Sequence, residues 1–178
     1  MTEERRYHAA PAEIQTAKGQ PFVVGYAAIF GSPSKMLTFR DGKKFREIVE
    51  PGAFLRSLMA RNDVLARYEH SEILGRVSNG TLRLSEDARG LRYEITPPNT
   101  QAGRDVIELI RRRDVPFASF AFTVPSGGDA WRSVDGILTR TLRNVDLIDI
   151  APVAQPAYGD TYTEIALRSY RSSQLARR

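Results

Sequence analysis

The chain contains no cysteine, only two histidines and no long apolar run. The absence of cysteine excludes disulfides, thiol catalysis and thiolate metal sites, and it is typical of a reducing compartment. No apolar segment approaches the roughly 20 residues of a membrane span, and the opening Met-Thr-Glu-Glu-Arg-Arg lacks the apolar part of a secretion signal. We therefore expect a soluble intracellular protein with no metal site and no other cofactor.

Acidic residues are fewer than basic ones, 21 against 26, which gives a formal net charge of +5. Residues 168–178 hold four arginines and no acidic residue, so the remainder of the chain carries only +1. A nucleic-acid-binding domain would carry its basic residues on a folded face or helix. We expect neither a specific nucleic acid nor a membrane as a partner.

A chain of 178 residues with 42% hydrophobic content suits one domain with a sizeable core. Short runs of β-branched and aromatic residues, separated by turns such as Asn79-Gly80, predict many strands. Pro51 is expected to open one helix and Thr100 to cap another. The fold class is therefore mainly β with some α (α+β), as a small, mostly antiparallel β-barrel surrounded by a few helices. The predicted strands span residues 21–30, 45–49, 64–69, 74–77, 81–85, 91–96, 117–124, 130–134, 136–143 and 145–153.

Three segments are expected along the chain. Residues 1–20 are polar and irregular, which predicts a flexible N-terminal arm. Residues 21–167 hold the predicted strands and helices and form the folded domain. Residues 168–178 lack apolar periodicity, which predicts a basic, flexible C-terminal tail that is dispensable for folding.

His70 ends a predicted strand in the segment Leu65-Ala-Arg-Tyr-Glu-His-Ser71. Histidine is the side chain best suited to act as a general base near neutral pH, and the other histidine, His8, lies in the polar N-terminal segment. Taken alone, His70 is best interpreted as a packing residue at the margin of the core. A catalytic role needs a carboxylate at one ring nitrogen and a hydroxyl at the other. Glu69 is expected to point to the opposite face.

Ser119 is the candidate hydroxyl. Alternate side chains of a strand point to opposite faces, so Ala118, Phe120 and Phe122 share one apolar face and Ser119 lies on the other beside the small Ala121. Small neighbours leave room for a substrate backbone to approach the hydroxyl. The common alternative is a half-buried strand serine bonded to a neighbouring carbonyl.

Asp149 is the candidate carboxylate, because burying it without a partner on an apolar strand face would be costly. His70 is one candidate partner, and a structural pair with Arg140 or Arg143 is weighed about equally. Asp146, on the opposite face, is less favoured. The expected phase-mates of Asp149 are Val145, Leu147, Ala151 and Val153.

His70, Ser119 and Asp149 together would suit nucleophilic attack on a peptide carbonyl. His70 would take the hydroxyl proton and Asp149 would orient the imidazole. The oxyanion that forms needs preorganised donors. A backbone N–H after Ser119, that of Phe120 first, and the guanidinium of Arg140 are both candidates, and the sequence does not choose between them.

Several short motifs follow one another in a specific order between about Phe22 and Thr163. They are Gly25-Tyr-Ala-Ala-Ile-Phe30, Glu50-Pro-Gly-Ala-Phe54, His70, Leu74-Gly-Arg-Val77, Gly90-Leu-Arg-Tyr-Glu94, Ser119-Phe-Ala-Phe122 and Asp149 followed by Pro156-Ala-Tyr158. In these residues the chain resembles the prohead proteases of tailed phages, which are capsid-maturation serine proteases distantly similar in fold to herpesvirus assemblin. The resemblance covers nearly the whole of the expected domain.

The resemblance implies a serine endopeptidase in which Ser119 is the nucleophile, His70 the base and Asp149 the acid, at a position where the family more often has Glu. It implies cleavage of scaffold, or of the scaffolding segment of the major capsid protein, inside the procapsid in the host cytoplasm. Self-cleavage is expected as well, with the C-terminal tail as its region. Neither the cleavage preference nor the oligomeric state follows from the sequence.

The alternative is a catalytically inactive structural or scaffold-binding barrel of the same fold, with the arginine-rich tail binding an acidic partner. The positions of the three side chains distinguish the two hypotheses. A protease requires His70, Ser119 and Asp149 to converge, whereas an inactive barrel allows them to diverge.

Overall fold

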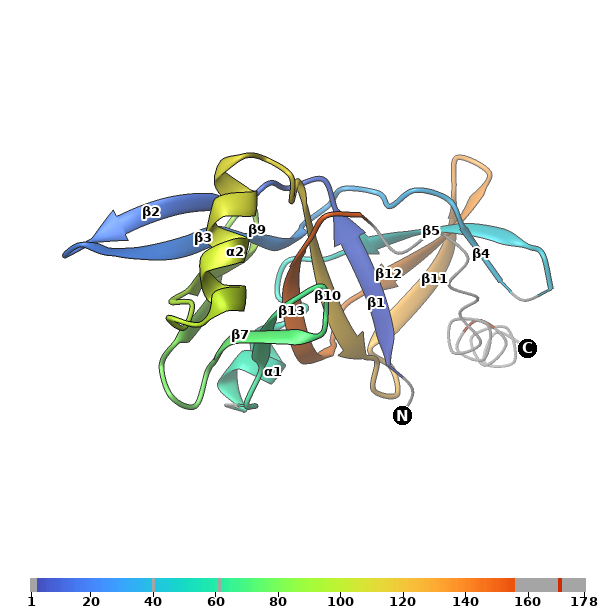
Figure 1. Cartoon of the computed structure of the whole chain (residues 1–178). Helices are drawn as coiled ribbons and strands as arrows, with labels where there is room; N and C mark the ends of the chain where they lie inside the picture. The colour runs from blue at the N-terminus through green and yellow to red at the C-terminus, as the bar shows by residue number, and fades with distance from the viewer. Residues whose placement is uncertain (1–2, 40, 61, 156–169, 171–178) are drawn as a thin grey trace.

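A computed structural model describes residues 3–39, 41–60, 62–155 and 170 of the chain (Figure 1). Strands dominate this part, and two helices of 5 and 11 residues accompany them. In chain order the elements are β1 Glu4–His8, β2 Glu13–Ala17, β3 Gln20–Ile29, β4 Leu37–Thr38, β5 Lys44–Val49, α1 Leu55–Met59, β6 Leu65–Tyr68, β7 Glu72–Arg76, β8 Leu82–Glu86, β9 Gly90–Ile95, α2 Gln101–Arg111, β10 Phe117–Thr123, β11 Asp129–Val134, β12 Ile137–Leu142 and β13 Asp146–Val153.

The described strands form three sheets. One has five strands in the order β1-β10-β13-β6-β7, and the other two have four strands each, in the orders β11-β12-β5-β4 and β2-β3-β9-β8. The pairs β12–β5 and β13–β6 are parallel, and the remaining pairs are antiparallel. In Figure 1 the β2–β3 hairpin extends to one end, β4 and β5 lie at the other, and β1, β10 and β13 cross between them.

The mainly β composition with two helices is confirmed, but the expected closed barrel is wrong. Closure requires the two edge strands of a sheet to pair with each other. In the part of the chain that the structure describes, β1 and β7 stand at opposite edges of the five-stranded sheet, and each pairs with one neighbour. The strands are divided among three open sheets.

The core lies against one face of β10. Ala118, Phe120 and Phe122 are fully buried in the main hydrophobic cluster, and the ring of Phe54 meets that of Phe120 edge-on, with centroids 5.4 Å apart. Burying a phenylalanine side chain contributes about 1.5–3 kcal/mol to folding. This apolar face fixes the phase of β10 and confirms that Ser119 lies on the other face.

The N-terminal residues differ from the irregular arm expected for residues 1–20. Residues 4–8 form β1, which pairs with β10, and residues 13–17 form β2, which pairs with β3. β1 buries the charged residues Glu4 and Arg6 rather than apolar ones, so it lacks the alternation that marks a strand in a sequence. The domain boundaries at 20/21 and 167/168 stay predictions.

The predicted C-terminal tail at 168–178 lies outside the described residues apart from Tyr170. The ring of Tyr170 packs on a small aromatic cluster, with its centroid 5.9 Å from that of Phe39 and 5.4 Å from that of Trp131.

The predicted helix after Thr100 is confirmed as α2. The Thr100 side chain accepts a hydrogen bond from the backbone N–H of Gly103 at 3.2 Å, as an N-cap should. No helix in the described ranges is long and apolar enough to cross a membrane.

Candidate active site

His70 lies in a tight turn directly after β6. Glu69 and His70 have φ angles of 51° and 55°, in the left-handed region of backbone conformation that residues other than glycine and asparagine rarely adopt. The backbone N–H of Ser71 closes the turn by donating to the carbonyl of Tyr68 at 3.0 Å. Ala66 packs in the core, and the turn takes His70 out of the strand phase of Ala66. The imidazole of His70 therefore lies, with Ser119, on the face of the five-stranded sheet opposite the core, called the outer face below.

Glu69 lines the same hollow as His70, so the expectation that it points to the opposite face is wrong. Its carboxylate accepts a hydrogen bond from the backbone N–H of Ala154 at 2.6 Å, and its own N–H donates to the carbonyl of Pro152 at 3.3 Å. These two contacts fasten the turn to the end of β13, the strand that carries Asp149.

Ser119 lies in the middle of β10, opposite Tyr7 on β1 and opposite Ala151 on β13. Its side chain is buried, and Ala121 and Ala151 are its small neighbours on the outer face. The hydroxyl oxygen lies 2.7 Å from Nε2 of His70 and 2.9 Å from the carbonyl oxygen of Arg6. The single hydroxyl proton therefore has two acceptors within reach.

Asp149 reaches the outer face through a β-bulge. Ala121 is in register with Asp149 and Phe122 with Leu147, so Ile148 has no partner on β10. Leu147 faces the core, whereas Asp149 contacts His70 on the other face. The expected phase relation between Leu147 and Asp149 is therefore wrong, because the extra residue of a bulge re-aims the side chain that follows it.

Three side chains form a continuous hydrogen-bonded chain at the outer face. Oδ1 of Asp149 lies 2.7 Å from Nδ1 of His70, and the Asp149 side chain is 6% exposed. A carboxylate at Nδ1 favours the tautomer in which that nitrogen carries the proton, and Nε2 is then free to accept from Ser119. Of the partners considered for Asp149, His70 is the one found, with Arg67 as a second contact.

The competing ion pairs lie elsewhere. Arg143 pairs with Glu50 at 3.4 Å, and Asp146 pairs with Arg56. Neither group contributes to the arrangement around His70.

The Ser119–His70 pair opens into a hollow of about 290 Å³. Its walls come from β1, from the turn after β6, from β10 and from the end of β13; they are formed by Arg5, Tyr7, Glu69, His70, Ser119, Val153 and Gln155. The contribution of β1 was missed in the sequence, because its residues were expected to be irregular. This hollow gives an incoming molecule access to the hydroxyl.

Arg140 is not brought to this site. Its guanidinium is fully buried and donates to Glu4 at 2.8 Å, to Glu47 at 3.0 Å and to Asp129 at 2.6 Å. Burial by itself favours the protonated form of Glu4, but Arg6 and Arg140 outweigh it and lower the pKa of that carboxyl. The oxyanion role expected of Arg140 is therefore withdrawn, because its donors are engaged in an internal ion-pair cluster.

Phe120, the other oxyanion candidate, follows Ser119 in a strand that has neighbours on both sides. It is in register with Arg6 on β1 and with Ile150 on β13. Backbone N–H groups of such a strand point toward the adjacent strands. The oxyanion role of the Phe120 N–H stays a prediction.

Replacing Arg140 with alanine is expected to lower the free energy of unfolding by about 3–5 kcal/mol, because three carboxylates would lose a buried cation. Urea denaturation measures this. The control is Arg143→Ala, which removes an arginine whose side chain is 44% exposed and should cost less than about 1 kcal/mol. Equal stabilities of the two variants would contradict a structural role for the cluster.

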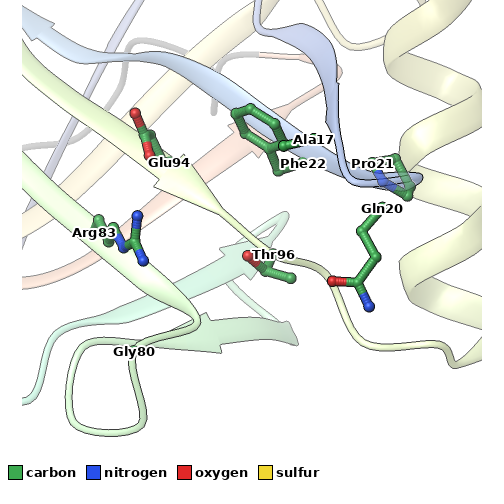
Figure 2. A pocket seen from close by; sticks show the side chains of 8 residues that line it. All are labelled: Ala17, Gln20, Pro21, Phe22, Gly80, Arg83, Glu94 and Thr96. Atoms are coloured by element: carbon green, nitrogen blue, oxygen red, sulfur yellow. The ribbon is translucent and has the colours of Figure 1, made fainter.

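A second hollow of about 190 Å³ lies on the β2-β3-β9-β8 sheet (Figure 2). Arg83 and Glu94 are the charged residues that line it, and Figure 2 shows them on neighbouring strands. Its lining includes no histidine and no serine. Within the described residues, no group of three or more histidine, aspartate and glutamate side chains is arranged to hold a metal ion. The hollow beside Ser119 is therefore the better candidate for chemistry.

Comparison with known proteins matches the chain to a protein family. The family model described as caudovirus prohead serine protease matches residues 9–175, which is most of the chain. No curated protein and no solved structure matches significantly. The match begins directly after β1 and includes all three residues of the hydrogen-bonded chain.

Proposed function

We propose, because the chain belongs to the caudovirus prohead serine protease family, that it is an endopeptidase with Ser119 as nucleophile, His70 as general base and Asp149 as orienting acid. The observation that carries the proposal is the unbroken contact from hydroxyl to imidazole to carboxylate, 2.7 Å at each step. An arrangement of this kind is the recurring solution for serine-dependent acyl transfer on unrelated folds.

In the first half of the reaction, Oγ of Ser119 attacks the carbonyl carbon of a peptide bond while Nε2 of His70 takes the hydroxyl proton. The protonated imidazole then gives this proton to the leaving amine, and an acyl-enzyme ester remains on Ser119. In the second half, His70 activates a water molecule that hydrolyses the ester. Throughout, Asp149 accepts a hydrogen bond from Nδ1 and stabilises the imidazolium form.

The surroundings of Ser119 suit a polypeptide substrate. The outer-face neighbours Ala121 and Ala151 carry only methyl groups and are fully buried, and the hollow that Ser119 lines gives a peptide backbone access to the hydroxyl. Tyr7 and Val153 provide apolar surface at the sides of the hollow. We infer that the substrate is scaffold, or the scaffolding segment of the major capsid protein, inside the procapsid in the host cytoplasm. Cleavage of the C-terminal tail of the protease is part of the same proposal.

The inactive structural or scaffold-binding alternative does not require the three side chains to meet. The convergence of the three side chains around one histidine favours the protease, because this arrangement costs folding free energy. Two consecutive residues in the left-handed region and a buried carboxylate are each unfavourable without compensation.

The test is co-expression with the capsid and scaffold proteins of the same phage. The wild type is expected to shorten one of them, and Ser119→Ala is expected to leave both at full length. Ser133→Ala is the matched control, because it removes an exposed serine from another strand, β11. Gel mobility and intact mass report the cleavage. Processing by Ser119→Ala at the wild-type level would refute the proposed nucleophile.

A further inference from the structure

The second carboxylate oxygen of Asp149 has a cationic neighbour. Oδ1 is bonded to His70, and Oδ2 lies 3.5 Å from Nε of Arg67. A buried carboxylate has two oxygens to satisfy, and an arginine is the most favourable partner for the one that the imidazole leaves free. The Arg67 side chain is 28% exposed, so its charge is partly screened by water.

The same guanidinium also contacts the turn that carries the base. Nη1 of Arg67 donates to the backbone carbonyl of Ser71 at 3.0 Å. Ser71 directly follows His70, whose backbone lies in the left-handed region. The planar guanidinium of Arg67 therefore contacts both the Asp149 carboxylate and the residue that follows His70.

Strand register explains why this residue reaches both groups. β6 and β13 are parallel, with Leu65 opposite Asp149. Arg67 is two residues further along β6, so it lies on the same face as the residue opposite Asp149.

We propose that Arg67 is a positioning residue of the active site, which holds the Asp149 carboxylate and the His70 turn in one geometry and tunes the charge that His70 experiences. This inference rests on the proposed function and deepens it. Arg67 changes the charge around His70 in two ways: it offsets part of the negative charge of Asp149, and it adds a positive charge to the site.

Other charged or titratable groups face the imidazole from every side. Asp149 approaches it from β13, Glu69 lies in its own turn, and Arg5 and Tyr7 come from β1 across the hollow. Of the arginines at the site, Arg67 is the one with a contact to Asp149 among the described residues. Removal of Arg67 therefore strengthens the electrostatic attraction between the His70 imidazolium and the Asp149 carboxylate.

The experiment uses a fluorophosphonate probe, which needs no knowledge of the natural substrate. The Ser119 oxygen bonds to phosphorus as the P–F bond breaks, fluoride leaves, and His70 takes the hydroxyl proton. The second-order labelling rate is measured from pH 5 to 9 for the wild type, Arg67→Gln and Arg67→Lys. Arg92→Gln is the matched control, since Arg92 is 31% exposed, pairs with Glu94 and lies in another sheet.

We expect Arg67→Gln to lower the labelling rate about tenfold, as loss of a group that orients a catalytic side chain does. The acid limb of its pH–rate profile for labelling should move to higher pH by about half a unit to one unit, because a nearby cation has been removed. Arg67→Lys should restore the position of the limb but only part of the rate, because an ammonium keeps the charge and lacks the planar fork. Arg92→Gln should match the wild type.

If the labelling rate and the pH of the acid limb in Arg67→Gln both equalled those of the wild type, the inference would be overturned. A lower rate with an unmoved limb would overturn it too, since a purely structural role predicts that result. If the wild type fails to label at Ser119, the proposed function fails instead. The NMR chemical shifts of the His70 ring then still test the inference, because they should change in Arg67→Gln and stay at the wild-type values in Arg92→Gln whether or not the serine reacts.

Discussion

Replacement of His70 by alanine is expected to slow fluorophosphonate labelling of Ser119 at least about a thousandfold at pH 7.5. Without the imidazole, the hydroxyl keeps the carbonyl of Arg6 as its acceptor, 2.9 Å away, and a peptide carbonyl cannot take a proton as a base does. The Ser119→Ala variant should not be labelled at residue 119. Peptide mapping by mass spectrometry locates the modified residue, and the time course gives the rate.

The control for this experiment is His8→Gln, which removes the other histidine of the chain. His8 ends β1, and its ring lies parallel to that of Phe120, with centroids 6.2 Å apart. The hydrogen bonds of the Ser119 and Asp149 side chains do not involve His8, so its variant should label within about threefold of the wild type. A His70→Ala variant that reacts as fast as His8→Gln would show that His70 is not the base.

Asp149→Asn is expected to lower the labelling rate about a thousandfold to ten-thousandfold, with little change in melting temperature. The amide is nearly isosteric with the carboxylate, but its NH₂ group cannot accept from Nδ1, and it carries no charge to stabilise an imidazolium. His70 would then be held in the wrong tautomer or left unoriented.

Asp146→Asn is the matched control, because Asp146 belongs to the same strand and pairs with Arg56 at a more exposed position. Its labelling rate should stay close to that of the wild type. If Asp146→Asn impaired labelling and Asp149→Asn did not, the acid role would pass to the other carboxylate.

Local patterns in the sequence predict the strand that carries Ser119 and the second helix. The aromatic residues at 120 and 122 fix one face of β10, which leaves Ser119 on the other, and Thr100 caps α2 as its residue type indicates. Both predictions depend on contacts between near neighbours in the chain. A period of two or a capping side chain is sufficient evidence for them.

The directions in which the side chains of His70 and Asp149 point could not be predicted in this way. The direction of His70 depends on a left-handed turn, and that of Asp149 on an unpaired Ile148, and neither irregularity has a glycine to mark it. Strand phase alone would have placed His70 with Ala66 and Asp149 with Leu147. Contacts with β10 and β13 determine these irregularities, and a single sequence does not reveal such distant pairings.

Arg140 and β1 illustrate a different limit. Near Asp149 in the sequence, Arg140 is an attractive donor, but in the fold it neutralises Glu4, Glu47 and Asp129. The same cluster explains why the charged side chains of Glu4 and Arg6 on β1 can be buried. Cross-sheet ion pairs of this kind satisfy charges that would otherwise predict an exposed segment.

The position of β10 between β1 and β13 has a consequence for timing during translation. Glu4 pairs with Phe122, and His70 must meet both Ser119 and Asp149, so these contacts join segments that leave the ribosome far apart in time. Such high contact order makes assembly late and slow. A nascent chain could not complete the proposed Ser119–His70–Asp149 chain until β13 had been synthesised. The protease would thus stay inert toward itself and toward nearby capsid proteins while it is being made.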